Sequence, residues 1–153
     1  MAKPWREGVR ALVLDSSDRV LLVHFSFPPY PWATPGGGIE DGESDEHALR
    51  RELAEEIGLD EFGLGPLLWT REHEFDLGGN FRGQRERCYL VRVEPFEPAP
   101  RLDLTVEGVD DTRWWTRDEI LNSTEVFAPR RLSGVLAEIL AHGPPAQPLV
   151  LGK

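Results

Sequence analysis

The segment from Ser44 to Gly58 has the most regular pattern in the chain, that of a helix with one apolar and one acidic side. Leu49, Leu53 and Ile57 recur every four residues, which places them on one side of a helix. Ser44 precedes an acidic first turn and Gly58 follows the last turn, as is typical of helix ends. The apolar side predicts that this helix packs against a sheet.

The acidic side of the same helix carries three carboxylates. Glu52, Glu55 and Glu56 stand at positions i, i+3 and i+4, which share one face. Like charges at this spacing cost about 0.2–0.5 kcal/mol per pair, and a divalent cation removes that cost. Carboxylate oxygens are the ligands that Mg²⁺ prefers. Taken alone, however, three glutamates also fit a solvated surface helix, because glutamate is common on helices.

The composition predicts one soluble globular domain over residues 1–153. Of the 153 residues, 40% are hydrophobic and 29% are charged. A single cysteine, Cys88, excludes a disulfide within the chain and suits a reducing compartment. The N-terminus lacks a signal-peptide pattern, and no apolar run approaches the roughly 18 residues of a membrane span. We therefore expect a cytoplasmic protein that does not enter a membrane.

The net charge of −10 excludes one class of partner and leaves another open. Binding along a nucleic-acid polymer needs clustered lysine and arginine, which the sequence does not supply. A small phosphate compound remains compatible with an acidic surface, because a bound divalent cation reverses the local field.

Apolar runs and turn signals predict the remaining elements. The expected strands cover Val9–Leu14, Arg19–Phe25, Leu67–Phe75, Arg85–Val93 and Thr112–Thr116. Phe25–Pro35 is expected to be an extended loop, and a last helix is expected from about Pro129 to Gly143. Strands on both sides of a central helix, followed by a terminal helix, predict an α/β (α+β) fold, with a central mixed β-sheet sandwiched between helices.

The region from Gly37 to Leu59 resembles the signature of the Nudix hydrolases, MutT-like proteins, without a mismatch. That signature is a Gly, five residues, Glu, seven residues, Arg-Glu, an aliphatic residue, any residue, Glu-Glu, any residue, Gly and an aliphatic residue. The matching positions are Gly37, Glu43, Arg51, Glu52, Leu53, Glu55, Glu56, Gly58 and Leu59. A chance match at a given start is on the order of 10⁻⁹ for ordinary residue frequencies.

The resemblance implies a metal-dependent hydrolase with an α/β/α sandwich fold. Glu52, Glu55 and Glu56 would bind Mg²⁺ or Mn²⁺ together with the Gly37 carbonyl, and a metal-activated water would attack a phosphoanhydride bond. Arg51 and Glu43 would pair and hold the loop against the helix. The general base stays open between Glu55, Glu56 and a distal acid, Glu107, for which a solvated loop position is an equal alternative.

The predicted substrate-binding set lies outside this motif. Alternation places Arg71 and His73 on one strand face, and likewise Arg85 and Arg87, where they would bind phosphate or instead pair with Glu72 or Glu86 across the strands. The aromatic residues before the glycines would stack on a base or pack in the core; among them we select Tyr30 and Trp32.

The expected substrate is a small nucleotide-type molecule, namely a nucleoside di- or triphosphate or a nucleoside diphosphate derivative. One alternative is a non-catalytic nucleotide-binding sensor with the same fold, although such modules usually lose glutamates that are all present here. Another is an isomerase of the isopentenyl diphosphate type, which needs an active-site cysteine and histidine ligands that Cys88 and four scattered histidines do not match. The sequence leaves the scissile bond and the oligomeric state open, a homodimer included.

Overall fold

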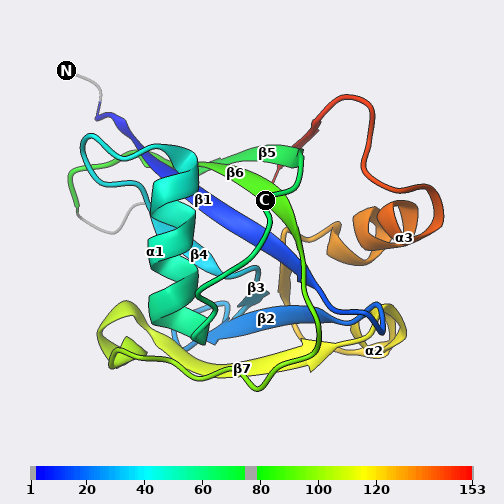
Figure 1. The fold of residues 1–153 in the computed structure, drawn as a ribbon. Helices are drawn as coiled ribbons and strands as arrows, with labels where there is room; N and C mark the ends of the chain where they lie inside the picture. The colour runs from blue at the N-terminus through cyan, green and yellow to red at the C-terminus, as the bar shows by residue number, and fades with distance from the viewer. Residues whose placement is uncertain (1–2, 75–78, 153) are drawn as a thin grey trace.

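The computed structural model of the chain describes residues 3–74 and 79–152, and its elements are labelled in Figure 1. The strands are β1 (Trp5–Leu14), β2 (Val20–Phe25), β3 (Trp32–Ala33), β4 (Gly36–Gly38), β5 (Leu67–Glu74), β6 (Gly83–Arg92), β7 (Val109–Trp115), β8 (Phe127–Ala128) and β9 (Leu149–Leu151). The helices are α1 (Asp45–Ile57), α2 (Arg117–Asn122) and α3 (Leu132–His142), with a 3₁₀ turn at Leu104–Glu107.

All the described strands belong to one mixed, curled sheet with the order β8-β3-β2-β1-β6-β5-β9. β1 runs parallel to β6 along its whole length, and β5 and β6 are antiparallel. β1 pairs with β2 at Leu14 and Val20, whereas Gly8–Arg10 in the middle of β1 pair with β4, and β7 pairs with β2. β2 and β4 therefore pair with different parts of β1.

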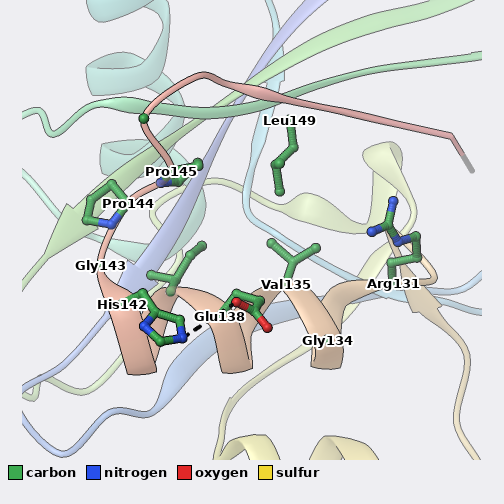
Figure 2. Close-up of a pocket in the computed structure, with 11 residues that line it drawn as sticks. Arg131, Gly134, Val135, Glu138, His142, Gly143, Pro144, Pro145 and Leu149 are labelled. Atoms are coloured by element: carbon green, nitrogen blue, oxygen red, sulfur yellow. Dashed lines mark ion pairs between the residues drawn. The ribbon is translucent and has the colours of Figure 1, made fainter.

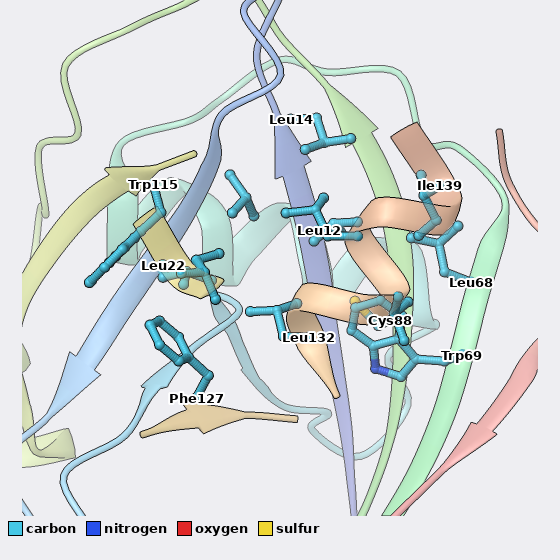
Figure 3. Close-up of a cluster of buried hydrophobic side chains, with 14 of the residues drawn as sticks. Leu12, Leu14, Leu22, Leu68, Trp69, Cys88, Trp115, Phe127, Leu132 and Ile139 are labelled. Carbon is cyan, nitrogen blue, oxygen red and sulfur yellow. The ribbon is translucent and has the colours of Figure 1, made fainter. Parts of the chain in front are cut away.

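Alternation along β1 gives the sheet two buried faces. Val9, Ala11 and Val13 pack in the cluster that contains the apolar side of α1, and Leu12 and Leu14 pack in the cluster that contains α3. Figure 3 shows the second cluster, which combines aliphatic side chains with the rings of Trp69, Trp115 and Phe127. The predicted α/β/α arrangement is confirmed: α1 covers one face and α3 the other (Figure 1).

The predicted helix at Ser44–Gly58 is confirmed together with both of its ends. The Ser44 side chain accepts a hydrogen bond from the His47 amide, which caps the first turn. Gly58 adopts a left-handed conformation with φ 73°, and its N–H donates to the Ala54 carbonyl. Leu49, Leu53 and Ile57 are fully buried, as their spacing predicted.

Several predicted boundaries are wrong because pairing partners extend or shorten the elements. β1 begins at Trp5, four residues earlier than expected, because Trp5 pairs with Gly83 of β6. The expected loop before the glycines contains β3, which pairs with β2. Thr116 caps α2 instead of ending a strand. Phe75, the last residue of another expected strand, lies outside the described residues.

The carboxyl-terminal third holds elements that the sequence reading missed. α2, β8 and β9 were not expected, and α3 begins at Leu132 instead of near Pro129. β8 and β9 have two and three residues, too few for a recognisable alternation. Among the described residues, no helix is both long enough and apolar enough to cross a membrane.

Candidate metal centre

Two glutamates of α1 lie against the glycine strand β4 and the 3₁₀ turn. Carboxylate oxygens of Glu52, Glu56 and Glu107 all lie within 4.8 Å of one another. Glu52 is 8% exposed and Glu56 only 2% exposed, whereas Glu107 is open to solvent. Three carboxylates at this separation form an oxygen-rich donor set that fits a hard divalent cation.

The glycines of β4 allow this close approach. A Cβ on Gly37 would lie 2.6–2.7 Å from the Glu52 carboxylate atoms. Gly36 has φ +146° and a Cβ there would lie 2.1 Å from the Val9 carbonyl oxygen, so only glycine fits. The Gly36 N–H donates to Glu56 Oε1 at 3.2 Å. The backbone of β4, which includes the predicted metal ligand Gly37, is thus part of the site.

Glu55 takes a different position from its two neighbours in the sequence. Its carboxylate lies 3.8 Å from Arg51 Nη1, and about a third of its side chain is exposed. Glu107 occupies the third position of the carboxylate cluster. The structure therefore brings the distal acid into the cluster, whereas Glu55 lies beside Arg51 at its edge.

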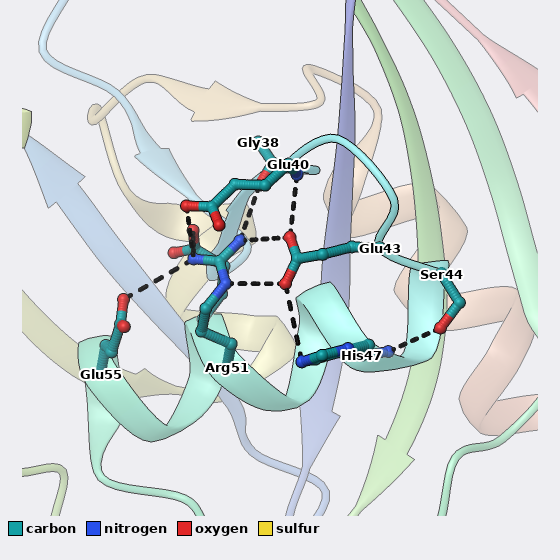
Figure 4. Close-up of polar contacts among 8 residues, drawn as sticks. Gly38, Glu40, Glu43, Ser44, His47, Arg51 and Glu55 are labelled. Atoms are coloured by element: carbon teal, nitrogen blue, oxygen red, sulfur yellow. Dashed lines mark hydrogen bonds and ion pairs between the residues drawn. The ribbon is translucent and has the colours of Figure 1, made fainter.

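The predicted pairing of Arg51 with Glu43 is confirmed. Arg51 Nε and Nη2 donate to the two Glu43 carboxylate oxygens at 2.9 and 2.8 Å, a bidentate pair (Figure 4). Arg51 Nη2 also donates to the Gly38 carbonyl at 3.1 Å, and Nη1 donates to Glu52 Oε1 at 2.9 Å. Hydrogen bonds from Arg51 lower the pKa of Glu43 to about 2. Arg51 thus joins the loop, β4 and the carboxylate cluster.

Burial changes the proton affinity of the clustered carboxylates. Burial raises the pKa of Glu56 to about 8, and nearby Glu52 and Glu107 add to this, while Arg10 and the Gly36 N–H oppose it. The pKa of Glu52 is also raised, first by burial, although Arg51 opposes the rise. Both carboxyl groups therefore hold their protons more tightly than exposed glutamates do, mainly because they are buried.

Arg71 and His73 lie on the α3 side of the sheet beside Glu86. Arg71 Nη1 donates to Glu86 Oε1 at 2.8 Å, and His73 Nε2 lies 3.0 Å from the same oxygen. Arg71 Nε also donates to the Gly152 carbonyl at 3.1 Å. The cross-strand pairing with Glu86 that the sequence left open is therefore present.

Arg85 and Arg87 lie on the opposite side of the sheet, facing α1. Arg85 Nε donates to Glu72 at 3.1 Å, and Arg87 Nε donates to Asp45 in the first turn of α1 at 2.6 Å. The predicted substrate-binding set is thus split between two faces, because neighbouring strand positions alternate. A ligand on one face cannot contact all four side chains.

The two aromatic residues predicted to bind the substrate, Tyr30 and Trp32, differ in their exposure to solvent. Trp32 is 7% exposed and packs edge-on against Trp115, with ring centroids 5.1 Å apart. Tyr30 is exposed, as is Phe27 in the same β2–β3 loop. Ser26 joins this loop to the 3₁₀ turn, because its N–H donates to the Gly108 carbonyl at 2.7 Å. The exposed aromatics therefore lie on a loop tied to the turn that carries Glu107.

The sequence did not single out Arg10, and it did not predict that Arg10 would share Glu86 with Arg71. Arg10 Nε donates to Glu86 Oε2 at 2.5 Å, and Nη1 donates to the Thr34 carbonyl at 2.9 Å. Burial alone would raise the pKa of Glu86, but Arg10, His73 and Arg71 lower it to about 2. The sequence does hold one sign of this contact: Arg10 stands inside the apolar run of a strand, and a buried charge needs a partner.

A separate pocket lies away from these residues. It has a volume of about 420 Å³ between α3 and the chain from Gly143 to Leu149, and Figure 2 shows its lining. Val135 and Ile139 supply apolar walls, while Glu138 and His142 lie at one side. None of the clustered carboxylates lines it, so it is not part of the candidate centre.

The Arg51–Glu43 pair yields a first prediction. Replacing Arg51 with Gln or Glu43 with Gln should lower hydrolytic activity about 10–100-fold, the usual effect of removing a partner that orients metal ligands. The double variant should lose less than the product of the two single losses, because both remove the same contact. Measured kcat/KM values for the four proteins check this. Independent, multiplicative losses would contradict the coupling.

Glu56 yields a prediction for the metal-free protein. Its pKa is about 8 when folded against an ordinary value of 4.5, so between these values the folded chain keeps a proton that the unfolded chain has lost. The free energy of unfolding should therefore fall as pH rises from about 4.5 to about 8. Urea unfolding in EDTA across this range should show a weaker pH dependence for Glu56→Gln, and identical slopes would refute the prediction.

Comparisons with known proteins agree with the motif and the fold. The family model described as the NUDIX domain matches residues 4–134. An RNA pyrophosphohydrolase of Rickettsia conorii is 28% identical over 152 aligned residues, which cover 88% of this chain and 89% of the relative.

Two solved structures show the same fold. The NUDIX domain of Shewanella oneidensis NrtR, complexed with ADP ribose, has a TM-score of 0.69 and 25% identity, with 90% of each chain covered. A NUDIX hydrolase from Nitrosomonas europaea has a TM-score of 0.68 and 24% identity, covering 93% of this chain and 92% of the other. Because the family model spans most of the chain, this protein belongs to the Nudix family of hydrolases, as the resemblance predicted.

Proposed function

We propose that this protein uses a divalent cation, Mg²⁺ or Mn²⁺, to hydrolyse the phosphoanhydride bond of a nucleoside di- or triphosphate or of a nucleoside diphosphate derivative. The observation that carries the proposal is the cluster of Glu52, Glu56 and Glu107, two of them buried with raised pKa values. A bound cation would relieve their repulsion, and it would polarise water and neutralise phosphate charge.

The roles of the residues follow from their exposure. Glu52, Glu56 and the Gly37 carbonyl would hold the cation from the buried side, and Glu107 would complete the site from the solvent side. Glu55 is partly exposed on the same helix, so it remains available either as a further ligand or as the general base. Arg51 and Glu43 would orient the ligands without contacting the substrate.

Two alternatives compete with a small-nucleotide hydrolase: an enzyme that acts on RNA and a sensor that binds a nucleotide without hydrolysing it. The name of the Rickettsia conorii relative suggests the triphosphate end of RNA, but a net charge of −10 argues against a long nucleic-acid contact. A sensor domain would bind a ligand without turning it over, as the ADP ribose complex of the NrtR domain illustrates for binding. The presence of every motif glutamate favours an enzyme.

A hydrolysis screen tests the proposal. Nucleoside triphosphates, nucleoside diphosphate derivatives and a 5′-triphosphate RNA would each be incubated with Mg²⁺ or Mn²⁺, and products identified by mass. Glu56→Gln and Glu107→Gln should each lose more than the roughly 10–100-fold caused by loss of an outer-shell partner. Glu46→Gln is the control, because Glu46 is an exposed glutamate of α1 whose carboxylate pairs with Arg50.

The outcomes of this screen separate the candidates. Cleavage of a small nucleotide that disappears in EDTA and in Glu56→Gln supports the proposal. Cleavage confined to RNA would change the substrate class. Tight binding of a nucleotide without turnover would identify a sensor, and near wild-type activity of Glu56→Gln would remove Glu56 from the metal site.

We also propose that the β2–β3 loop recognises the base. Tyr30 and Phe27 are exposed beside the turn that carries Glu107, and an aromatic ring stacked on a base contributes about 1–3 kcal/mol. Tyr30→Ala and Phe27→Ala should raise KM, with different increases for different bases and little change in kcat. Leu121→Ala, an exposed apolar residue on α2, serves as the control. An unchanged ranking of substrates would assign the loop a purely structural role.

A further inference from the structure

Arg10 has an unusual environment for a residue in the central strand β1. Its neighbours Val9 and Ala11 are fully buried apolar residues, and its own side chain is only 15% exposed. The guanidinium makes two hydrogen bonds, from Nε to Glu86 and from Nη1 to the Thr34 carbonyl. Burying a guanidinium has a large desolvation cost, which well-placed hydrogen-bond acceptors can offset. Arg10 has two such acceptors.

The Thr34 contact connects Arg10 to the backbone of the candidate metal centre. Thr34 is followed by Pro35 and then by β4, which supplies the Gly36 N–H to Glu56 and the Gly37 carbonyl. The Pro35 carbonyl accepts from the Ala11 N–H at 2.9 Å, and Arg10 itself pairs with Gly36 in the sheet. β1 therefore holds this segment by backbone bonds, and the Arg10 side chain adds a hydrogen bond to the Thr34 carbonyl.

Glu86 fixes Arg10 from the neighbouring strand. It is 3% exposed, and it is held in turn by Arg71 and His73 on β5. The contacts run from β5 through Glu86 and Arg10 to the segment before β4. Arg10 also bears electrostatically on Glu56, the most buried carboxylate of the cluster.

From these contacts we propose that Arg10 is a positioning residue for the metal centre. Its planar fork, anchored on Glu86, holds the Thr34 carbonyl and thereby sets the place of the β4 backbone groups that face Glu56 and the cation. The inference rests on the proposed function, since it concerns ligands of the proposed cation. Arg10 itself contacts neither substrate nor cation.

Binding of Mn²⁺ to the metal-free protein, without substrate, tests this role by calorimetry or electron paramagnetic resonance. Arg10→Met should weaken Mn²⁺ binding about 10–100-fold, the range expected when an outer-shell partner is lost. Glu86→Gln should weaken it in the same direction by a smaller factor, and it serves if Arg10→Met does not fold. Arg10→Lys should not restore the affinity, because an ammonium group cannot make both bonds in the geometry of the fork.

The control is a second ion pair, which lies in the turn between β1 and β2. Arg19 contacts Asp15 at 2.7 Å just beyond the far end of β1, and Asp15 is buried. Arg19→Met should reduce the urea concentration at the unfolding midpoint while leaving Mn²⁺ affinity within about twofold, since it has no contact with β4.

The results distinguish a failure of the role proposed for Arg10 from a failure of the proposed metal centre. Wild-type Mn²⁺ affinity in folded Arg10→Met or Glu86→Gln would overturn the role of Arg10 and leave the proposed function standing. Full rescue by Arg10→Lys would also overturn it, because charge instead of the fork would then be responsible. Absence of Mn²⁺ binding by the wild-type protein would remove the metal centre itself, and with it the inference about Arg10.

Discussion

The contact between the α1 carboxylates and the backbone of β4 is the constraint on which the rest of the site depends. Glu52 reaches the strand only because Gly37 leaves room for its carboxylate, and Glu56 accepts a hydrogen bond from the Gly36 N–H. Leu49 and Leu53, on the apolar side of α1, are fully buried and fix the rotation of the helix about its axis. This rotation directs the two glutamates toward β4. Packing energy from the core thus holds in place a cluster of charges that would otherwise separate.

Such a cluster needs positive charge from several directions. Arg51 approaches Glu52 from the helix and ties it to Glu43 and to Gly38, while Arg10 lies on the sheet side near Glu56. Burial nevertheless raises the pKa of Glu56 to about 8, and nearby Glu52 and Glu107 add to the rise. A bound divalent cation would favour the ionised carboxylates and would stabilise the folded protein by mass action.

Local patterns predicted the parts of this site that lie close together in the sequence. The spacing of Leu49, Leu53 and Ile57 gave the helix and its buried side, and the Arg51–Glu43 pair followed from the motif. Contacts between distant segments were harder to predict. Glu107 joins the cluster through the fold of the chain after β6, and Arg71 and Arg87 separate because neighbouring strands fix which face each residue takes.

By itself, the sequence determined the helix, the family and the chemical character of the site, because these depend on residue types within about one helix and its preceding loop. Only the tertiary structure decided that Glu107 joins Glu52 and Glu56 in the carboxylate cluster, that Trp32 is buried while Tyr30 is exposed, and that Arg10 and Glu86 meet. The physical reason is that burial and charge pairing are set by sheet register and strand neighbours, which bring together residues far apart in the chain.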